Sequence, residues 1–269
     1  PWLLQGVGLL GDWLDLEDSP ATGLALFHTV FNVLGVVLMW PLADTMASRL
    51  RRRFRGHDET EGQPRYLDQN VASVPSLAVD ALRREIFRLG RKAIARARAG
   101  LAALQSRPGQ PRDGGYESLG RAIQDFVAGL SRASMSESTA QALATLLRVQ
   151  HYYDNCHERG AGIGAGRDAL AALADDPLRL RIVDLAGEAD DLLVQLDPTQ
   201  APFAPLAAHQ GERFEAGYES LKAALLAAGA DGRLPIPAMD ALLRSFSDLR
   251  RTVQQAAKAA RLLAQLSQG

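Results

Sequence analysis

The sequence predicts an all-α protein in which one transmembrane helix is followed by a domain of two tandem three-helix bundles. Residues 19–43 contain no Lys, Arg, Asp or Glu, and after Pro75 apolar residues recur at helical spacing almost throughout. The pentapeptide GYESL occurs twice, at 115–119 and 217–221. Ala and Leu dominate the apolar residues, which favours helices because both lose little conformational freedom on entering one.

The uncharged run at 19–43 is long enough to span a membrane. A helix rises about 1.5 Å per residue, so this run can cross the roughly 30 Å hydrocarbon core with some tilt. All three tryptophans fall in the first part of the chain, as Trp2, Trp13 and Trp40, and the basic stretch RLRRRFR follows at 49–55. By the positive-inside rule, residues after about 49 are expected in the cytoplasm. A buried core helix of a soluble protein is the alternative.

Residues 1–55 are expected to form the C-terminal end of a larger membrane domain. Residues 1–14 are apolar but too short to span a bilayer, so they resemble the tail of a preceding span. Within the predicted span, polar and small residues form one helical stripe, which contains Ala25, His28, Thr29, Asn32 and Gly35. Polar side chains in lipid normally face protein or a water-filled cavity. His28, Thr29 and Asn32 therefore either line a transport path or pack against further transmembrane helices of the same protein.

Residues 56–75 are polar and rich in Gly and Pro, which predicts a linker, and residues 76–269 are predicted to form the helical domain. Its first helix carries apolar residues at helical spacing from Ala78 to Leu104. A capping box of Ser134 and Glu137 predicts the start of a helix that continues to about Leu173. The remaining helices are expected at about 116–131, 177–196, 203–229 and 237–267.

Two short sequence matches in the same order predict an internal duplication. GYESL is followed in both cases by LLR, at 146–148 and again at 242–244. The two spacings differ by a few residues, which a loop absorbs at low cost. We therefore expect two repeats of three helices, at about 76–174 and 177–268.

Several segments resemble the bacterial Na/Pi-cotransporter family. ALFHTVFNVLGVVLMWP at 25–41 is similar to that family's last span. PRYLD at 64–68 and PSLAVDALRREIFRLG at 75–90 are similar to its linker and to the first helix of its PhoU-like domain. YESLKAALLAAGADGRLP at 218–235 and LRRTVQQAAKAARLL at 249–263 resemble the second half of that domain. The resemblance covers nearly the whole chain.

This resemblance implies sodium-dependent symport of inorganic phosphate across the bacterial inner (plasma) membrane by the full-length protein, with a cytoplasmic PhoU-like regulatory domain. Phosphate, sodium as the coupling ion and membrane lipid are the expected partners, and a homo-oligomer is left open. The family's Gln-Ser-rich transport motifs are absent from this chain, which is expected to be the C-terminal portion of a longer protein. The alternative is a membrane-tethered PhoU-like phosphate-signalling or interaction module without transport. A third hypothesis gives the domain a purely structural role.

The resemblance also points to a candidate metal site. PhoU proteins carry an acidic motif of the form D-x-E-R-x-x-D in each bundle, which here aligns with YYDNCHE at 152–158 and with DLRRTVQ at 248–254. Asp154 and Glu158 lie one helical turn apart and are the candidate ligands of a divalent metal, to which His151 and His157 could add nitrogen donors. A solvated carboxylate pair is the alternative. Arg250 in the second copy argues against a metal there.

Other function classes have little support in the sequence. The net charge of −1 argues against a general affinity for nucleic acid, and the single cysteine, Cys156, excludes an internal disulfide and is expected to be a packing residue. The glycine-rich stretch at 160–166 lacks a nucleotide-binding context and predicts a weak or closely packed point in a long helix.

The arginines of 83–98 could bind phosphate, anionic lipid or an acidic partner, or form a solvated face. No set of nucleophile, base and orienting residue predicts an enzyme.

Overall fold

The structure is a computed structural model that describes residues 28–33, 35–37, 39, 46, 62–107, 114–130, 135–200 and 203–266. All regular secondary structure in these ranges is helical, which confirms the predicted fold class at the level of an all-α chain. The chain divides into two compact units, residues 1–57 and 58–269.

The first unit holds the predicted membrane span, most of which lies outside the described residues. Residues 28–33, 35–37 and 39 are helical, and His28, Thr29 and Asn32 expose their side chains. The rest of the 19–43 run and the basic stretch at 49–55 also fall outside the described ranges. None of the described helices has both the length and the apolarity that crossing a bilayer requires.

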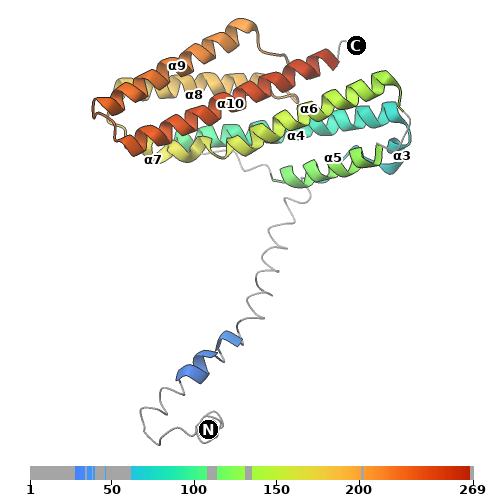
Figure 1. The fold of residues 1–269 in the computed structure, drawn as a ribbon, viewed down its shortest axis with the longest axis horizontal. Helices are drawn as coiled ribbons and strands as arrows, with labels where there is room; N and C mark the ends of the chain where they lie inside the picture. Colours follow the sequence, from blue (N-terminus) through green and yellow to red (C-terminus); the bar gives the residue numbers. More distant parts are fainter. Residues whose placement is uncertain are drawn as a thin grey trace, which may run out of the picture. The chain divides into compact units, whose positions relative to one another are not determined.

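The described residues of the second unit form six long helices and shorter helical segments (Figure 1). The elements in chain order are α3 (Gln69–Ala72), α4 (Pro75–Leu104), α5 (Tyr116–Leu130), α6 (Glu137–Gly160), the 3-10 helix η1 (Ile163–Gly166), α7 (Arg167–Ala171), α8 (Asp176–Gln195), α9 (Ala208–Ala230) and α10 (Ile236–Leu266). Local sequence explains several of the starts. Pro75 and Pro177 occupy the first turns of α4 and α8, where a missing N–H costs nothing, and Asp175 caps α8 by accepting from the N–H of Leu178 at 3.0 Å.

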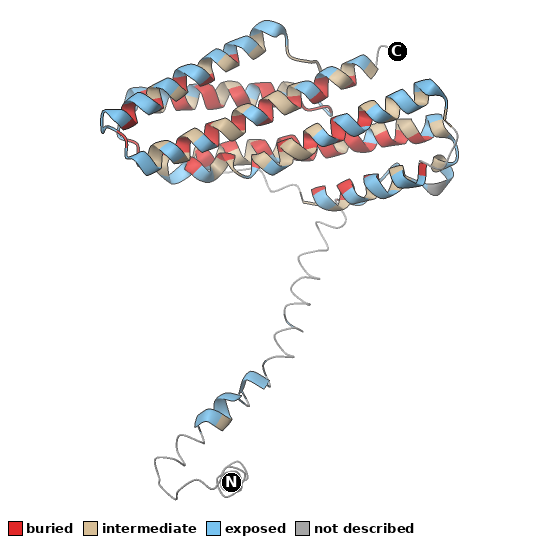
Figure 2. Cartoon of the chain, in the orientation of Figure 1, coloured by how far each residue is buried: buried red, intermediate tan, exposed pale blue. Residues whose placement is uncertain are grey.

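Helix α6 lies between α4 and α10, and these three helices form the centre of the domain (Figure 1). Helix α5 packs on α4, while α9 packs on both α8 and α10. Leu82, Ile86 and Leu89 of α4 are fully buried, and residues from both predicted repeats contribute to a single hydrophobic core. Figure 2 shows the buried residues along the facing sides of the helices. Burial of a leucine or isoleucine side chain in this core stabilises the fold by about 1.5–3 kcal/mol relative to an exposed one.

Contacts between α6 and α10 join positions that the repeat alignment makes equivalent. Cys156 is buried, and its Sγ donates to the carbonyl oxygen of Thr252, its counterpart 96 residues later, at 3.4 Å. Two further contacts flank this one. The Lys258 nitrogen lies 6.0 Å from the centre of the Tyr152 ring, and Gly162 packs against the carboxylate of Asp248. Positions 152 and 248 are counterparts, as are 162 and 258. Such reciprocal contacts are expected if the two predicted repeats are related by a two-fold axis near the Cys156–Thr252 contact.

The helix predicted to run from Ser134 to Leu173 is interrupted, which corrects the sequence prediction. It begins at Glu137 and is capped by Ser136, which accepts from the N–H of Thr139 at 3.3 Å, whereas Ser134, the predicted cap, lies outside the described residues. It then ends at Gly160 and is followed by η1 and α7. Helix α4 packs closely on this end, since a Cβ on Gly160 would lie 3.1 Å from the Ala97 nitrogen of α4, which agrees with the closely packed point predicted at 160–166.

Two further segments differ from their predicted form. Helix α9 begins at Ala208, not at 203, and the five described residues before it are not helical. Within the predicted linker of 56–75, residues 69–72 form α3, whose N-cap Asp68 accepts from the N–H of Asn70 at 3.0 Å. The described part of the linker is therefore an ordered piece of the domain.

Candidate functional site

The two predicted metal ligands occupy different environments on α6. Asp154 is half-buried and its Oδ1 accepts a hydrogen bond from the phenol of Tyr116 at 2.7 Å, whereas Glu158 is exposed. Across the described residues, no group of three or more His, Cys, Asp or Glu side chains is placed to hold a metal ion. The structure thus pairs Asp154 with a tyrosine hydroxyl, and divalent metal binding by Asp154 and Glu158 stays a prediction.

A histidine stacks on the same tyrosine. The ring of His157 lies 3.7 Å from that of Tyr116, nearly parallel to it, and its Nε2 lies 3.2 Å from Oε1 of Glu117. Burial lowers the pKa of His157, with a further contribution from Arg96, while Glu117 acts in the opposite direction. Burial, with the Asp154 carboxylate beside it, raises the pKa of Tyr116, so this hydroxyl stays protonated and remains a donor. His151, the other predicted nitrogen donor, is exposed and bonds to Asn155 instead.

The second repeat places an arginine where the first has Asp154. The Arg250 guanidinium lies 4.8 Å from the ring centre of Tyr218, the tyrosine of the second GYESL, and its Nε donates to Oε2 of Glu215 at 2.6 Å. Gln254, the counterpart of Glu158, donates to the other oxygen of the same carboxylate, also at 2.6 Å. The carboxylate of Glu215 is thus occupied by two donors of α10.

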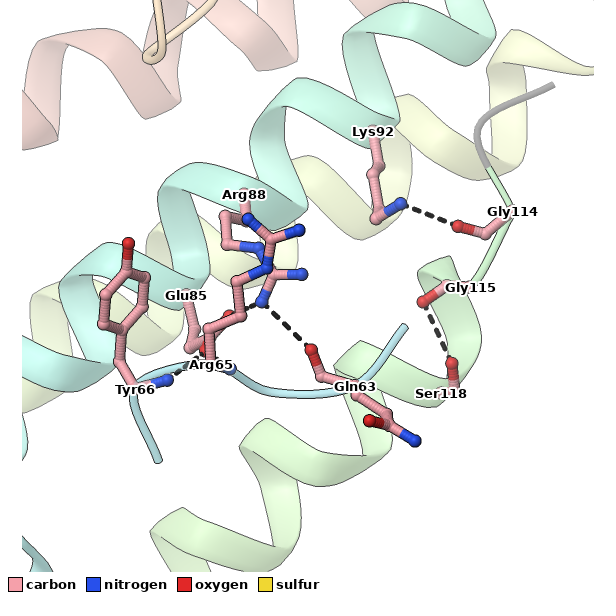
Figure 3. A network of polar contacts seen from close by, with 9 residues as sticks. All are labelled: Gln63, Arg65, Tyr66, Glu85, Arg88, Lys92, Gly114, Gly115 and Ser118. Atoms are coloured by element: carbon pink, nitrogen blue, oxygen red, sulfur yellow. Dashed lines mark hydrogen bonds and ion pairs between the residues drawn. The ribbon is translucent and has the colours of Figure 1, made fainter. Parts of the chain in front are cut away.

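A buried glutamate fixes the segment that enters the domain (Figure 3). The side chain of Glu85 in α4 is fully buried, and its Oε1 accepts from the backbone N–H groups of Arg65 and of Tyr66, the latter at 2.7 Å. Its Oε2 lies 2.5 Å from Nη1 of Arg88, which also donates to the carbonyl oxygen of Gln63 at 3.1 Å. A buried carboxylate with three donors has its charge compensated within the fold.

The same segment packs against the start of α5. A Cβ on Gly62 would lie 1.8 Å from Oγ of Ser118 and 2.7 Å from the carbonyl oxygen of Gly115, so only glycine fits there without movement of α5. Lys92, which is 2% exposed, donates from Nζ to the carbonyl oxygen of Gly114 at 2.7 Å (Figure 3). We call residues 62–66 with Glu85, Arg88 and Lys92 the linker latch.

The linker latch was not foreseen, although the sequence contains a signal for it. Glu85 and Lys92 are seven residues apart, and each lies three residues after a core leucine, Leu82 and Leu89. Charged residues at this spacing lie at the edge of the apolar stripe. Since a charge is rarely buried without a partner, two of them there indicate specific partners elsewhere in the chain.

Comparison with known proteins gives one informative similarity. No protein-family model matches the chain, and no solved structure matches it. Over 91 residues the chain is 31% identical to a Salmonella typhimurium protein described as "Putative inorganic phosphate export protein YjbB". The alignment covers 33% of this chain and 17% of that protein, so the chain spans less than a fifth of its relative's length. This similarity supports a phosphate-related role.

Proposed function

We propose that the full-length protein moves inorganic phosphate across the bacterial inner membrane in symport with sodium, and that the helical domain is a PhoU-like regulator on the cytoplasmic side. The observation that carries the proposal is the similarity to the Salmonella protein described as a phosphate exporter. The resemblance of residues 25–41 and 64–90 to the sodium–phosphate family supports the same substrate and adds sodium. His28, Thr29 and Asn32 are assigned either to the transport path or to packing against the other transmembrane helices.

The direction of net transport follows from the gradients and not from the protein alone. The relative's description names export, whereas the family resemblance implies uptake. A symporter that couples phosphate to sodium runs in either direction, because reversing the combined gradients reverses the driving force. A test must therefore measure both uptake and efflux of phosphate.

The deciding experiment reconstitutes the full-length protein in liposomes and follows radiolabelled phosphate. An inward sodium gradient should drive uptake that potassium does not support, and an outward sodium gradient should drive efflux from preloaded vesicles. The 269-residue chain alone, reconstituted in the same way, is the control and should show neither flux. If the full-length protein is folded and inserted but moves no phosphate in either direction, the proposal fails in favour of a tethered signalling module.

The proposed regulatory role draws on the linker latch, because a segment that is held on the domain could transmit a change in the state of the domain to the chain that precedes it. Two forms of the full-length protein test this role: one that ends at residue 56 and one that carries Glu85→Ala. Regulation predicts that both alter the phosphate dependence of the flux. If the truncated form transports with unchanged rate and unchanged phosphate dependence, the domain is structural.

A further inference from the structure

A cavity of about 360 Å³ lies where the end of α4 meets the first turns of α8. Its polar lining comes from Gln105, Ser106, Arg107 and Arg179, and its remaining lining residues are apolar or alanine. None of the residues that line it is an Asp or a Glu. The cavity therefore carries two guanidinium groups and no carboxylate in its wall.

Arg179 has an unused donor in this wall. One of its terminal nitrogens donates to the carbonyl oxygen of Leu173, but its Nε is buried and has no acceptor among the described residues. The nearby carboxylate of Asp175 is occupied by the N–H of Leu178 and by Arg233. A buried guanidinium N–H without an acceptor is costly, and a bound anion would provide one. Arg179 is also the fourth residue of α8, near the positive end of the helix dipole, where an anion is favoured.

Ser106 presents a hydroxyl at a position that normally takes glycine. Its φ of 53° lies in the left-handed region, and the N–H groups of Ser106 and Arg107 bond to the carbonyl oxygens of Ala103 and Ala102. This is a Schellman ending, in which glycine is preferred because it has no Cβ. The same bonds occupy carbonyl groups at the end of α4, which weakens the repulsion between the helix end and an anion.

We propose that this cavity binds a small oxyanion, either inorganic phosphate or the phosphate group of a small phosphorylated metabolite. Arg107 and Arg179 supply the positive charge, and the Ser106 hydroxyl supplies a further donor. A second cavity of about 350 Å³ shares Gln105 and Arg107 with the first and is lined by Arg98, Asp190 and Asp191. Arg98 donates to both carboxylate oxygens of Asp190, so Asp191 is the carboxylate there that could accept a hydrogen bond from a sugar hydroxyl. The site follows from the geometry of the helical domain and does not depend on the proposed transport activity.

The test titrates the purified 269-residue chain with inorganic phosphate and, separately, with adenosine monophosphate by calorimetry. The proposal expects saturable binding that Arg107→Gln and Arg179→Gln each weaken by about tenfold or more. The matched control is Arg181→Gln, since Arg181 is an exposed arginine of the same helix and should leave the affinity unchanged. Tighter binding of adenosine monophosphate would identify a phosphorylated metabolite as the ligand, and equal or tighter binding of phosphate would identify the free ion.

A second variant separates binding from folding. Ser106→Gly removes the hydroxyl but relieves the left-handed strain, so it should raise thermal stability while it lowers affinity for the oxyanion. No saturable binding of either probe up to about 10 mM would overturn the proposal. Binding that persists unchanged in Arg107→Gln and Arg179→Gln would overturn it as well.

Discussion

The phenol of Tyr116 donates to Asp154 at 2.7 Å, whereas Tyr218, at the same place in the second GYESL, has the Arg250 guanidinium 4.8 Å from its ring centre. The two GYESL segments thus share a tyrosine and have groups of opposite charge beside it. The first repeat uses the hydroxyl of the tyrosine, and the second uses the face of its ring.

This difference predicts unequal effects of removing the two hydroxyls. Tyr116→Phe should lower the free energy of unfolding by about 1–2 kcal/mol, because it leaves a half-buried carboxylate without its donor. Tyr218→Phe is the matched control and should cost less than about 0.5 kcal/mol, since the ring face that Arg250 covers is retained. Urea denaturation followed by circular dichroism measures both. Equal losses in the two variants would contradict the assigned roles.

The lowered pKa of His157 predicts a pH dependence of stability. The usual pKa of the group is 6.5, and its value in the folded state is lower, so the unfolded chain binds more protons between the two values. The free energy of unfolding should therefore fall as the pH drops below 6.5 and level off below the folded-state pKa.

Substitution isolates this contribution. His157→Gln should flatten the slope of stability against pH in that window, whereas His151→Gln, at an exposed position of the same helix, should leave the slope intact. Chemical denaturation at a series of pH values provides the measurement. An unchanged slope in His157→Gln would assign the pH dependence to other groups.

The space around two helical glycines predicts that alanine will have opposite effects on stability at the two positions. A Cβ on Gly90 would lie 2.5 Å from the buried ring of Tyr153, so Gly90→Ala should destabilise the fold by about 1–3 kcal/mol. Nothing lies within 4 Å of a Cβ on Gly120 in α5, so Gly120→Ala should stabilise the fold by about 0.5–1 kcal/mol. Thermal unfolding distinguishes the two, and a stabilised Gly90→Ala variant would contradict the described packing.

The linker latch predicts protection from proteolysis. Glu85→Ala removes the acceptor of two backbone N–H groups and the ion-pair partner of Arg88, so residues 62–66 should separate from α4 far more often. Tryptic cleavage after Arg65, followed by mass spectrometry, should accelerate by about tenfold or more, because the segment must leave α4 to enter the protease.

Asp80→Asn is the control for that experiment. Asp80 pairs with Arg83 and Arg84 on the exposed side of α4, where ion pairs contribute little. Its loss should leave cleavage after Arg65 unchanged. Fast cleavage in the unsubstituted chain would show that the segment is not held by Glu85.

Helix positions were largely predictable because local signals and tertiary packing agree. Proline in the first turn and regular apolar spacing place α4 and α8 within a few residues of their observed bounds. The glycine-rich stretch at 160–166 predicted a weak or closely packed point, but not that the helix ends at Gly160. At that point α4 approaches closely, and the N–H of Gly166 donates to Oγ of Ser245, 79 residues away. Helical spacing alone cannot show which glycine ends a helix.

The candidate sites were less predictable than the fold. The i, i+4 spacing of Asp154 and Glu158 correctly places both on α6 but says nothing of Tyr116, which comes from α5 and takes the first carboxylate. Glu85 and Arg179 bond to backbone groups of other segments. Every residue type has these backbone groups, so the sequence does not indicate which of them will be partners.

The short segment before the linker latch limits the distance between Arg55 and the domain. Gly62 is the first described residue of the domain and is buried, and six residues, 56–61, separate it from Arg55. Whatever path these residues take, a fully extended chain spans about 25 Å at most from Arg55 to Gly62. If the basic stretch lies at the membrane surface, as the proposed topology has it, Gly62 can lie no more than about 25 Å from that surface. On the proposed function, contacts between the helical domain and a transport domain of the same chain would be intramolecular, at an effective concentration on the order of millimolar. A contact too weak to detect between the separated domains would then suffice in the intact protein.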